Sequence, residues 1–182
     1  MAEGGFYHTL NTYDRARFTF SFMQFGAHVP EGDFVRYLRK LLKLPLAVEY
    51  FPDLTLENNR ITRVTDHRPD PLESDQTTEG LLDYLNPSLR EVEDTEVIQA
   101  AKFIHWVQHD PLHKDAQVET AISNRRDKMV QYARKYALDG KSDIVCLVVA
   151  DIRHQGRAKD TSIIHALQSP DGLTPFGIAF VT

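Results

Sequence analysis

The stretch from Glu3 to Phe25 reads EGGFYHTLNTYDRARFTFSFMQF, and the predicted fold is organised around it. Between positions 17 and 22, polar and aromatic residues alternate in the order Arg-Phe-Thr-Phe-Ser-Phe. An alternation of period two is typical of a β-strand with one buried face. Asn11 and Asp14 precede it and are common turn residues. We therefore expect short strands joined by turns over residues 5–27.

The rest of the chain changes from strand to helix patterns. A second hairpin is predicted over residues 54–64, where two short runs flank the turn sequence Glu-Asn-Asn-Arg. Residues 65–79 contain two prolines and almost no apolar side chain, which predicts a linker or mobile loop. Residues 80–167 show helical spacing nearly throughout. The sequence therefore predicts one mainly α, α+β domain over 1–182, with a small β-hairpin lobe and a helical lobe.

Several positions carry signals for the start of a helix. A helix is expected to open near Asp33, with Arg39 on its outward face. Ser88 and Glu91 have the spacing of a capping box, which predicts a helix start there. Asp110-Pro111 predicts another start, with proline at the first helical position.

The last predicted helix covers roughly 142–167. Its most apolar part, Ile144–Ala150, predicts that it is the central and fully buried helix. Cys146 lies in this run and is the only cysteine, so no intramolecular disulfide is possible. We expect a buried, inert thiol.

Size and composition indicate a globular protein. The chain has 182 residues, of which 42% are hydrophobic and 26% charged, and this suits one domain with two lobes. The net charge of −5 predicts no nucleic-acid partner. Two interpretations of this charge remain open: it favours a cationic polymer as substrate, or it only maintains solubility.

No apolar run is long enough to cross a membrane, so we expect no membrane insertion. The beginning of the chain shows no pattern of a secretory signal peptide. Localisation therefore stays open between the cytoplasm and export by a non-classical or phage-type route.

Two carboxylates, Glu3 and Asp14, flank the first turn region. Hydrolysis of a glycosidic bond requires one carboxyl group as a general acid and a second, ionised one as a base or nucleophile. The alternative is structural: a Glu near a terminus is commonly solvated, and an Asp before Arg commonly belongs to a turn.

The same stretch resembles the lysozyme superfamily, in which a catalytic Glu ends a helix and a β-hairpin follows. The sequence Phe-Met-Gln-Phe at 22–25 fits the end of the superfamily signature. Residues 14–19 are similar to the segment of the family-46 chitosanases, and of related peptidoglycan-cleaving enzymes, that supplies the second carboxylate and a water-holding threonine. Ser21 stands where the superfamily usually has glycine, and Ala16 where the chitosanases have arginine.

The resemblance extends toward the C-terminus. His109-Asp110-Pro111, Gln117 and the segment Asn124–Asp127 resemble one chitosanase helix. The segments 136–140 and 151–156 resemble the turn and the Asp…His-Gly end that follow it. Together these short matches span most of residues 3–156.

The resemblance implies roles for particular residues. Glu3 is implied as the general acid, Asp14 as the base, and Thr19 as the residue that helps to hold the attacking water. The polar and aromatic residues around them are candidates for binding the substrate: Tyr7, Asn11, Tyr13, Arg15, Arg17 and Gln24.

Asp151, Arg153 and His154 form the densest polar group of the last helix. Two interpretations remain open for them. They hold the acid in its geometry and tune its pKa, or they form an ordinary buried ion pair between helices.

The eight histidines are scattered, and His105/His109 at i, i+4 lack the Glu of the HExxH motif. The sequence therefore predicts no metal site and no cofactor.

The expectation is a lysozyme-like fold and an endo-acting glycoside hydrolase that degrades the cell wall or a related polysaccharide substrate. The polymer is of the amino-sugar class, peptidoglycan or chitosan-like. By resemblance to the chitosanases the mechanism is inverting. The alternative is a non-catalytic glycan-binding or interaction domain on the same scaffold. The oligomeric state is left open.

Overall fold

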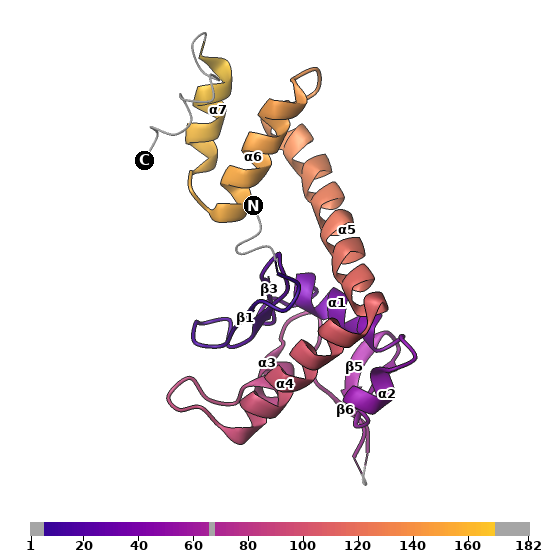
Figure 1. The fold of residues 1–182 in the computed structure, drawn as a ribbon. Helices are drawn as coiled ribbons and strands as arrows, with labels where there is room; N and C mark the ends of the chain where they lie inside the picture. Colours follow the sequence, from indigo (N-terminus) through magenta and orange to yellow (C-terminus); the bar gives the residue numbers. More distant parts are fainter. Residues whose placement is uncertain (1–5, 66–67, 170–182) are drawn as a thin grey trace. The chain divides into compact units, whose positions relative to one another are not determined.

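The computed structural model describes residues 6–65 and 68–169, which form an α+β fold (Figure 1). Seven helices and two three-stranded antiparallel sheets make up the described part of the chain. The chain divides into two compact units, one up to Ile122 and one from Ser123. Helix α5 (Pro111–Tyr136) spans this boundary, and each unit is described separately below.

The first sheet is formed by β1 (Leu10–Asn11), β2 (Thr19–Phe20) and β3 (Phe25–Gly26), in the order β1-β2-β3. The alternation at 17–22 predicts a longer strand than the two residues of β2. Arg17 and Ser21 have φ of 57° and 90°, which takes the backbone out of the extended region on both sides of β2. Phe18 and Phe20 are fully buried as predicted, but Thr19 and Ser21 are buried as well, so burial does not alternate along this segment as expected.

The second sheet is formed by β4 (Leu54–Glu57), β5 (Arg60–Arg63) and β6 (Asp70–Pro71). Asn58 and Asn59 connect β4 and β5 with φ of 50° and 62°. Two left-handed residues are what a type I′ hairpin turn requires, and asparagine tolerates this conformation.

A mobile loop was predicted over 65–79, but part of this segment belongs to the folded unit. Asp70–Pro71 pairs with β5 as strand β6. Leu72 and Glu73, which follow it, are both buried. The reason is tertiary, because Glu73 forms ion pairs with the buried Arg39 and the half-buried Arg60, which lie elsewhere in the sequence.

Helix α1 (Asp33–Leu41) packs against β3 and β5 and lies in the centre of the first unit. Phe34 and Tyr37, one face of α1, contact Phe103 with ring centroids 5.7 and 6.4 Å apart. Phe20 of β2 lies 5.2 Å from the same ring. These aromatic contacts hold the first sheet against α1 and α4 (Asp94–His109).

The short helices α2 (Ala47–Tyr50) and α3 (Glu79–Leu85) complete the first unit, in which α3 packs beside α4. The predicted capping box at Ser88 is wrong, because α4 begins only at Asp94. The Ser88 hydroxyl instead accepts a hydrogen bond from Arg90 N within a local turn. The start at Asp110-Pro111 is confirmed: Pro111 opens α5, and Asp110 Oδ1 accepts a hydrogen bond from Leu112 N at 2.9 Å.

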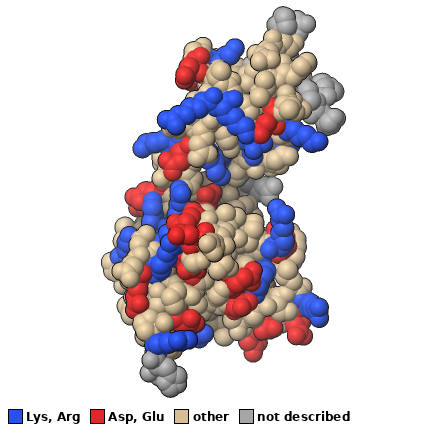
Figure 2. All heavy atoms as spheres, turned by 180° about the vertical axis from the view of Figure 1, so that it is seen from behind, with Lys and Arg blue, Asp and Glu red and all other residues tan. Residues whose placement is uncertain are grey.

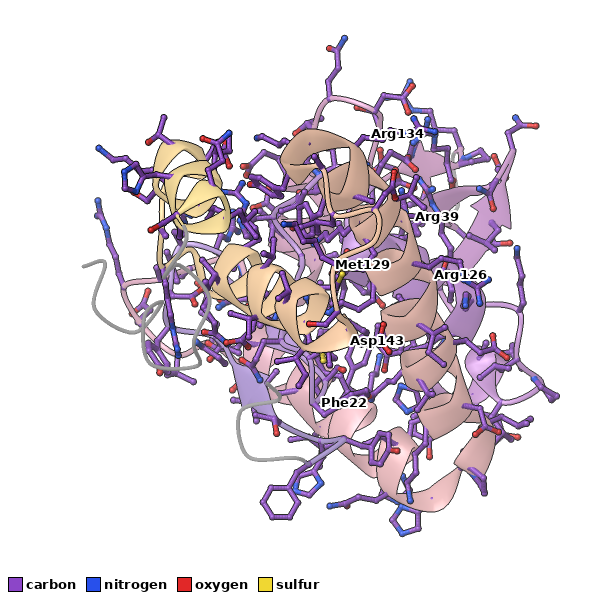
Figure 3. The ribbon with its side chains drawn as sticks, turned by 90° about the horizontal axis from the view of Figure 1, so that it is seen from above. Phe22, Arg39, Arg126, Met129, Arg134 and Asp143 are labelled. Atoms are coloured by element: carbon purple, nitrogen blue, oxygen red, sulfur yellow. The ribbon has the colours of Figure 1, made fainter. Side chains whose placement is uncertain are left out.

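Arg39 does not face outward as predicted. Its guanidinium (labelled in Figure 3) is buried, and it binds Glu73 at 2.8 Å and Glu31 at 2.6 Å. Arg60 pairs with the same two carboxylates and with the exposed Asp75. Glu73, whose side chain is fully buried, also accepts a hydrogen bond from Ile61 N. This network joins α1 to the second sheet.

The second unit contains the end of α5 with α6 (Asp143–Gln155) and α7 (Asp160–Gln168). A single helix over 142–167 was predicted, but Gly156, in the left-handed conformation at φ 63°, ends α6 and separates it from α7. The helix is also not fully buried, since Ile144 and Leu147 are 66% and 69% exposed. Cys146 is half-buried rather than buried.

Among the described residues, no helix has both the length and the apolar character that are needed to cross a membrane.

We predict that Glu73→Ala destabilises the protein by about 3–5 kcal/mol, because it leaves the buried Arg39 short of a counter-charge. Asp75→Ala is the matched control. It removes an exposed carboxylate from Arg60 of the same network and is expected to cost less than about 1 kcal/mol. Equilibrium unfolding in urea measures both values. Equal losses for the two variants would contradict the structural role of Glu73.

The burial of His113 predicts that the free energy of unfolding decreases in acid. It is fully buried and hydrogen-bonded to Tyr37 Oη, and burial lowers the pKa of its imidazole to about 3, whereas an unfolded histidine titrates near 6.5. Below pH 6.5 the unfolded state binds a proton that the folded state does not. The neutral, buried His113 therefore makes its full contribution to the free energy of unfolding above pH 6.5, and this contribution is lost as the pH falls toward 3.

Between pH 7 and pH 4 we expect the free energy of unfolding of the wild type to fall by about 3 kcal/mol more than that of His113→Gln, which cannot titrate. The exposed His165 provides the control, because His165→Gln should retain the pH dependence of the wild type. The same pH dependence in His113→Gln and in the wild type would show that His113 is protonated in the folded protein.

Candidate functional site

Asp14 lies in a turn that fixes both oxygens of its carboxylate. Asn11 Nδ2 donates to Asp14 Oδ2 at 3.1 Å, and Ala16 N donates to Asp14 Oδ1 at 2.8 Å. Asn11 Oδ1 in turn accepts a hydrogen bond from Tyr13 N. These bonds are typical of a turn built by Asx side chains. They also leave each carboxylate oxygen with a further lone pair for another donor.

Strand pairing brings Thr19 to the same side of the sheet as Asn11. The two residues are directly opposite one another on β1 and β2. Side chains of opposed residues on antiparallel strands share a face, and successive residues along a strand alternate between faces. Thr19 therefore lies on the face that carries Asn11, opposite to Phe18 and Phe20, although Thr19 is itself buried. Asn11 is thus the strand partner of Thr19 and a hydrogen-bond donor to Asp14.

Asn86, at the end of α3, anchors the loop that carries Asp14. Its amide Nδ2 donates to Thr12 O at 2.9 Å and to Arg17 O at 2.8 Å, on the two sides of Asp14. The backbone carbonyl of Asn86 accepts a hydrogen bond from Arg17 Nε at 2.8 Å. Asn86 is buried, so these bonds satisfy backbone groups that would otherwise be costly to bury. The sequence marks Asn86 only as the residue before a proline, and no local pattern indicates its partners.

The two arginines beside Asp14 are placed differently. Arg17 forms ion pairs with Asp83 at 2.6 Å and Glu79 at 3.2 Å on α3, so its guanidinium serves to tether the loop. Arg15 is exposed. Of these two predicted substrate-binding residues, Arg15 is therefore the one whose side chain extends to solvent.

The predicted aromatic platforms also differ in exposure. Tyr13 is 84% exposed and precedes Asp14. Tyr7 is half-buried, with its ring edge-on to Phe22 at 5.3 Å (Phe22 is labelled in Figure 3). Tyr13 is therefore the predicted aromatic residue that offers an open ring face next to the carboxylate.

Gln24 and Ser21 form the turn between β2 and β3. Gln24 Nε2 and Gln24 N both donate to Ser21 O, at 3.2 and 3.0 Å, and Met23 N donates to Ser21 Oγ at 3.2 Å. Gln24 thus has a bond within the turn. The φ of 90° at Ser21 lies in a region that favours glycine.

The polar group of the last helix lies in the second unit. Arg153 on α6 pairs with Asp160 on α7 at 3.0 Å, and Asp160 also binds Lys135 and Tyr136 of α5. The hydrogen bond from Lys135 is the largest cause that lowers the pKa of Asp160. Asp151 is half-buried on α6, as is His154. Within this unit, Arg153 joins α6 to α7.

Glu3, the predicted acid, lies outside the described residues. The structure thus brings together Asn11, Asp14 and Thr19, with Tyr13 and Arg15 at the surface beside them. The pairing of Glu3 with Asp14 stays a prediction.

Charge on the surface is mixed. On the face drawn in Figure 2, Lys and Arg side chains lie among Asp and Glu side chains.

Comparison of the chain with family models, with curated proteins and with solved structures finds no match in any of the three.

We predict that Asn86→Asp destabilises the protein by about 2–4 kcal/mol, because a carboxylate cannot donate to the carbonyls of Thr12 and Arg17. Asn59→Asp makes the same chemical change in the exposed turn between β4 and β5, and its effect should stay within about 0.5 kcal/mol. Thermal and urea unfolding report both. A loss for Asn86→Asp as small as that of the control would refute the anchoring role.

Proposed function

We propose that this protein is an endo-acting glycoside hydrolase with a lysozyme-like fold that cleaves an amino-sugar polymer of the peptidoglycan or chitosan class. The observation that carries the proposal is the linked set Asp14, Asn11 and Thr19. Asn11 orients the carboxylate, and the strand register places the threonine hydroxyl on the same face. The chitosanase resemblance assigns Asp14 to the base and Thr19 to the water, and Asn11 is one of the predicted substrate-binding residues.

In this proposal Asp14 acts as the general base. Its two hydrogen bonds orient the carboxylate before substrate binds, which reduces the reorganisation needed to reach the transition state. A water molecule between Asp14 and the Thr19 hydroxyl loses its proton to Asp14 as it attacks the anomeric carbon. Glu3 donates a proton to the leaving oxygen. Such an inverting geometry requires the two carboxyl groups to stand roughly 6.5–9.5 Å apart.

The exposed ring of Tyr13 supports a sugar as the ligand. An aromatic face beside a fixed carboxylate is suited to stack on the apolar face of a pyranose ring. The net charge of −5 favours a polymer with free amino groups over an anionic one.

A second candidate is a glycan-binding domain without catalysis. It is favoured by the hydrogen bonds of Asp14, which are also those of an ordinary turn. The same exposed Tyr13 would serve binding alone. In that case the full chain is retained by insoluble peptidoglycan or chitosan and releases no reducing ends.

We predict that Asp14→Asn lowers the rate of polymer cleavage by about 10²–10⁴-fold, the range that a general base contributes, while binding to the insoluble polymer persists. Release of reducing ends from peptidoglycan and from chitosan measures the rate, and co-sedimentation measures binding. Asp115→Asn, a change at an exposed aspartate on α5, should cleave at the rate of the wild type. Cleavage that is unaffected by Asp14→Asn would remove Asp14 from the mechanism, and binding without any wild-type cleavage would establish the second candidate.

A further inference from the structure

Two histidines form a fixed pair on the exposed side of α4. The imidazoles of His105 and His109, one helical turn apart, stack with their ring centroids 4.1 Å apart and their planes at 22°. Both residues are exposed. Side chains at i and i+4 lie on one face of a helix, so the two rings share one exposed face of α4.

The Nδ1 atom of each ring is already engaged. His105 Nδ1 is hydrogen-bonded to Tyr50 Oη at 2.8 Å, and His109 Nδ1 donates to His105 O at 2.7 Å. Because a carbonyl can only accept, the second bond places the proton of His109 on Nδ1 and leaves the lone pair on Nε2; the bond to Tyr50 Oη is compatible with the same tautomer of His105. A metal-binding histidine commonly has this arrangement, with its second nitrogen bonded to an oxygen that orients the ring.

The core holds the partner of His105 in place. The ring of Tyr50 stacks on Trp106 with centroids 4.8 Å apart and planes at 4°. Trp106 is fully buried and donates from Nε1 to Asp110 Oδ2 at 2.8 Å. His105 is thus oriented through Tyr50 by the packed interior, which lowers the entropy lost when both rings bind one ligand.

We propose that His105 and His109 form a binding site for a late first-row divalent cation, with Cu²⁺ preferred over Zn²⁺. Imidazole nitrogen suits these ions, and Cu²⁺ stands above Zn²⁺ in the general order of affinity. No cluster of three or more His, Cys, Asp or Glu that could hold a metal converges in the described residues, so water or a ligand completes the coordination.

This site was not predicted from the sequence because the pair lacks the Glu of HExxH. That Glu is the general base of metalloproteases and not a ligand, so its absence argues against protease chemistry and leaves metal binding open. The ring geometry and the two Nδ1 bonds are what the spacing alone does not show.

The test is titration of the untagged full chain with CuCl₂ and with ZnCl₂ by calorimetry at pH 7.5. Because the second imidazole binds as part of a chelate, His105→Ala and His109→Ala should each weaken Cu²⁺ binding by roughly 10²-fold. Tyr50→Phe removes the oxygen that orients His105 and should weaken binding about tenfold. His165→Ala removes an exposed histidine of α7 and should leave the affinity unchanged.

A second measurement distinguishes the loss of the metal site from the loss of folding in a variant. Cu²⁺ that binds only the folded helix should raise the Tm of the wild type and of His165→Ala, but not that of the double variant His105→Ala/His109→Ala. The proposal is overturned if the double variant binds Cu²⁺ with the affinity of the wild type, or if its Tm rises equally with the metal.

Discussion

The geometry of the Asp14 loop depends on one buried amide. Asn86 binds carbonyls on both sides of Asp14, at Thr12 and Arg17, although Thr12 lies 74 residues earlier in the chain. Without these donors the loop would have to expose its carbonyls to water or leave them unpaired. Arg17 strengthens the same connection through its ion pairs with α3. The position of the carboxylate is therefore decided by α3 as much as by the loop itself.

The core of the first unit stabilises buried polar groups in two different ways. His113 is kept neutral by burial and shares a hydrogen bond with Tyr37. Arg39 and Glu73 form an ion pair at 2.8 Å. The neutral His113 makes the stability of the protein sensitive to acid. The ion pair makes it sensitive to the removal of either Arg39 or Glu73. Both lie on α1 or contact it, so α1 determines how the two sheets are held.

The two proposals rest on separate features of the first unit. The hydrolase proposal depends on the Asp14 loop and the strand register, whereas the metal site depends on α4 and on the Tyr50–Trp106 stack. Neither uses a residue of the other. The loss of one activity therefore carries no consequence for the other, and each can be measured in the variants designed for the other as a control for folding.

The sequence by itself determined the α+β class, the burial of Phe18 and Phe20, the turn at Asn58-Asn59 and the start of α5 at Pro111, because each depends on residues close together in the chain. It also singled out Asp14, Asn11 and Thr19 as candidates. Only the tertiary structure decided that Arg39 is buried with Glu73, that Asn86 anchors the Asp14 loop, and that Tyr50 orients His105. These contacts join residues that are far apart in sequence. Their energy comes from pairing buried polar groups, which no local pattern encodes.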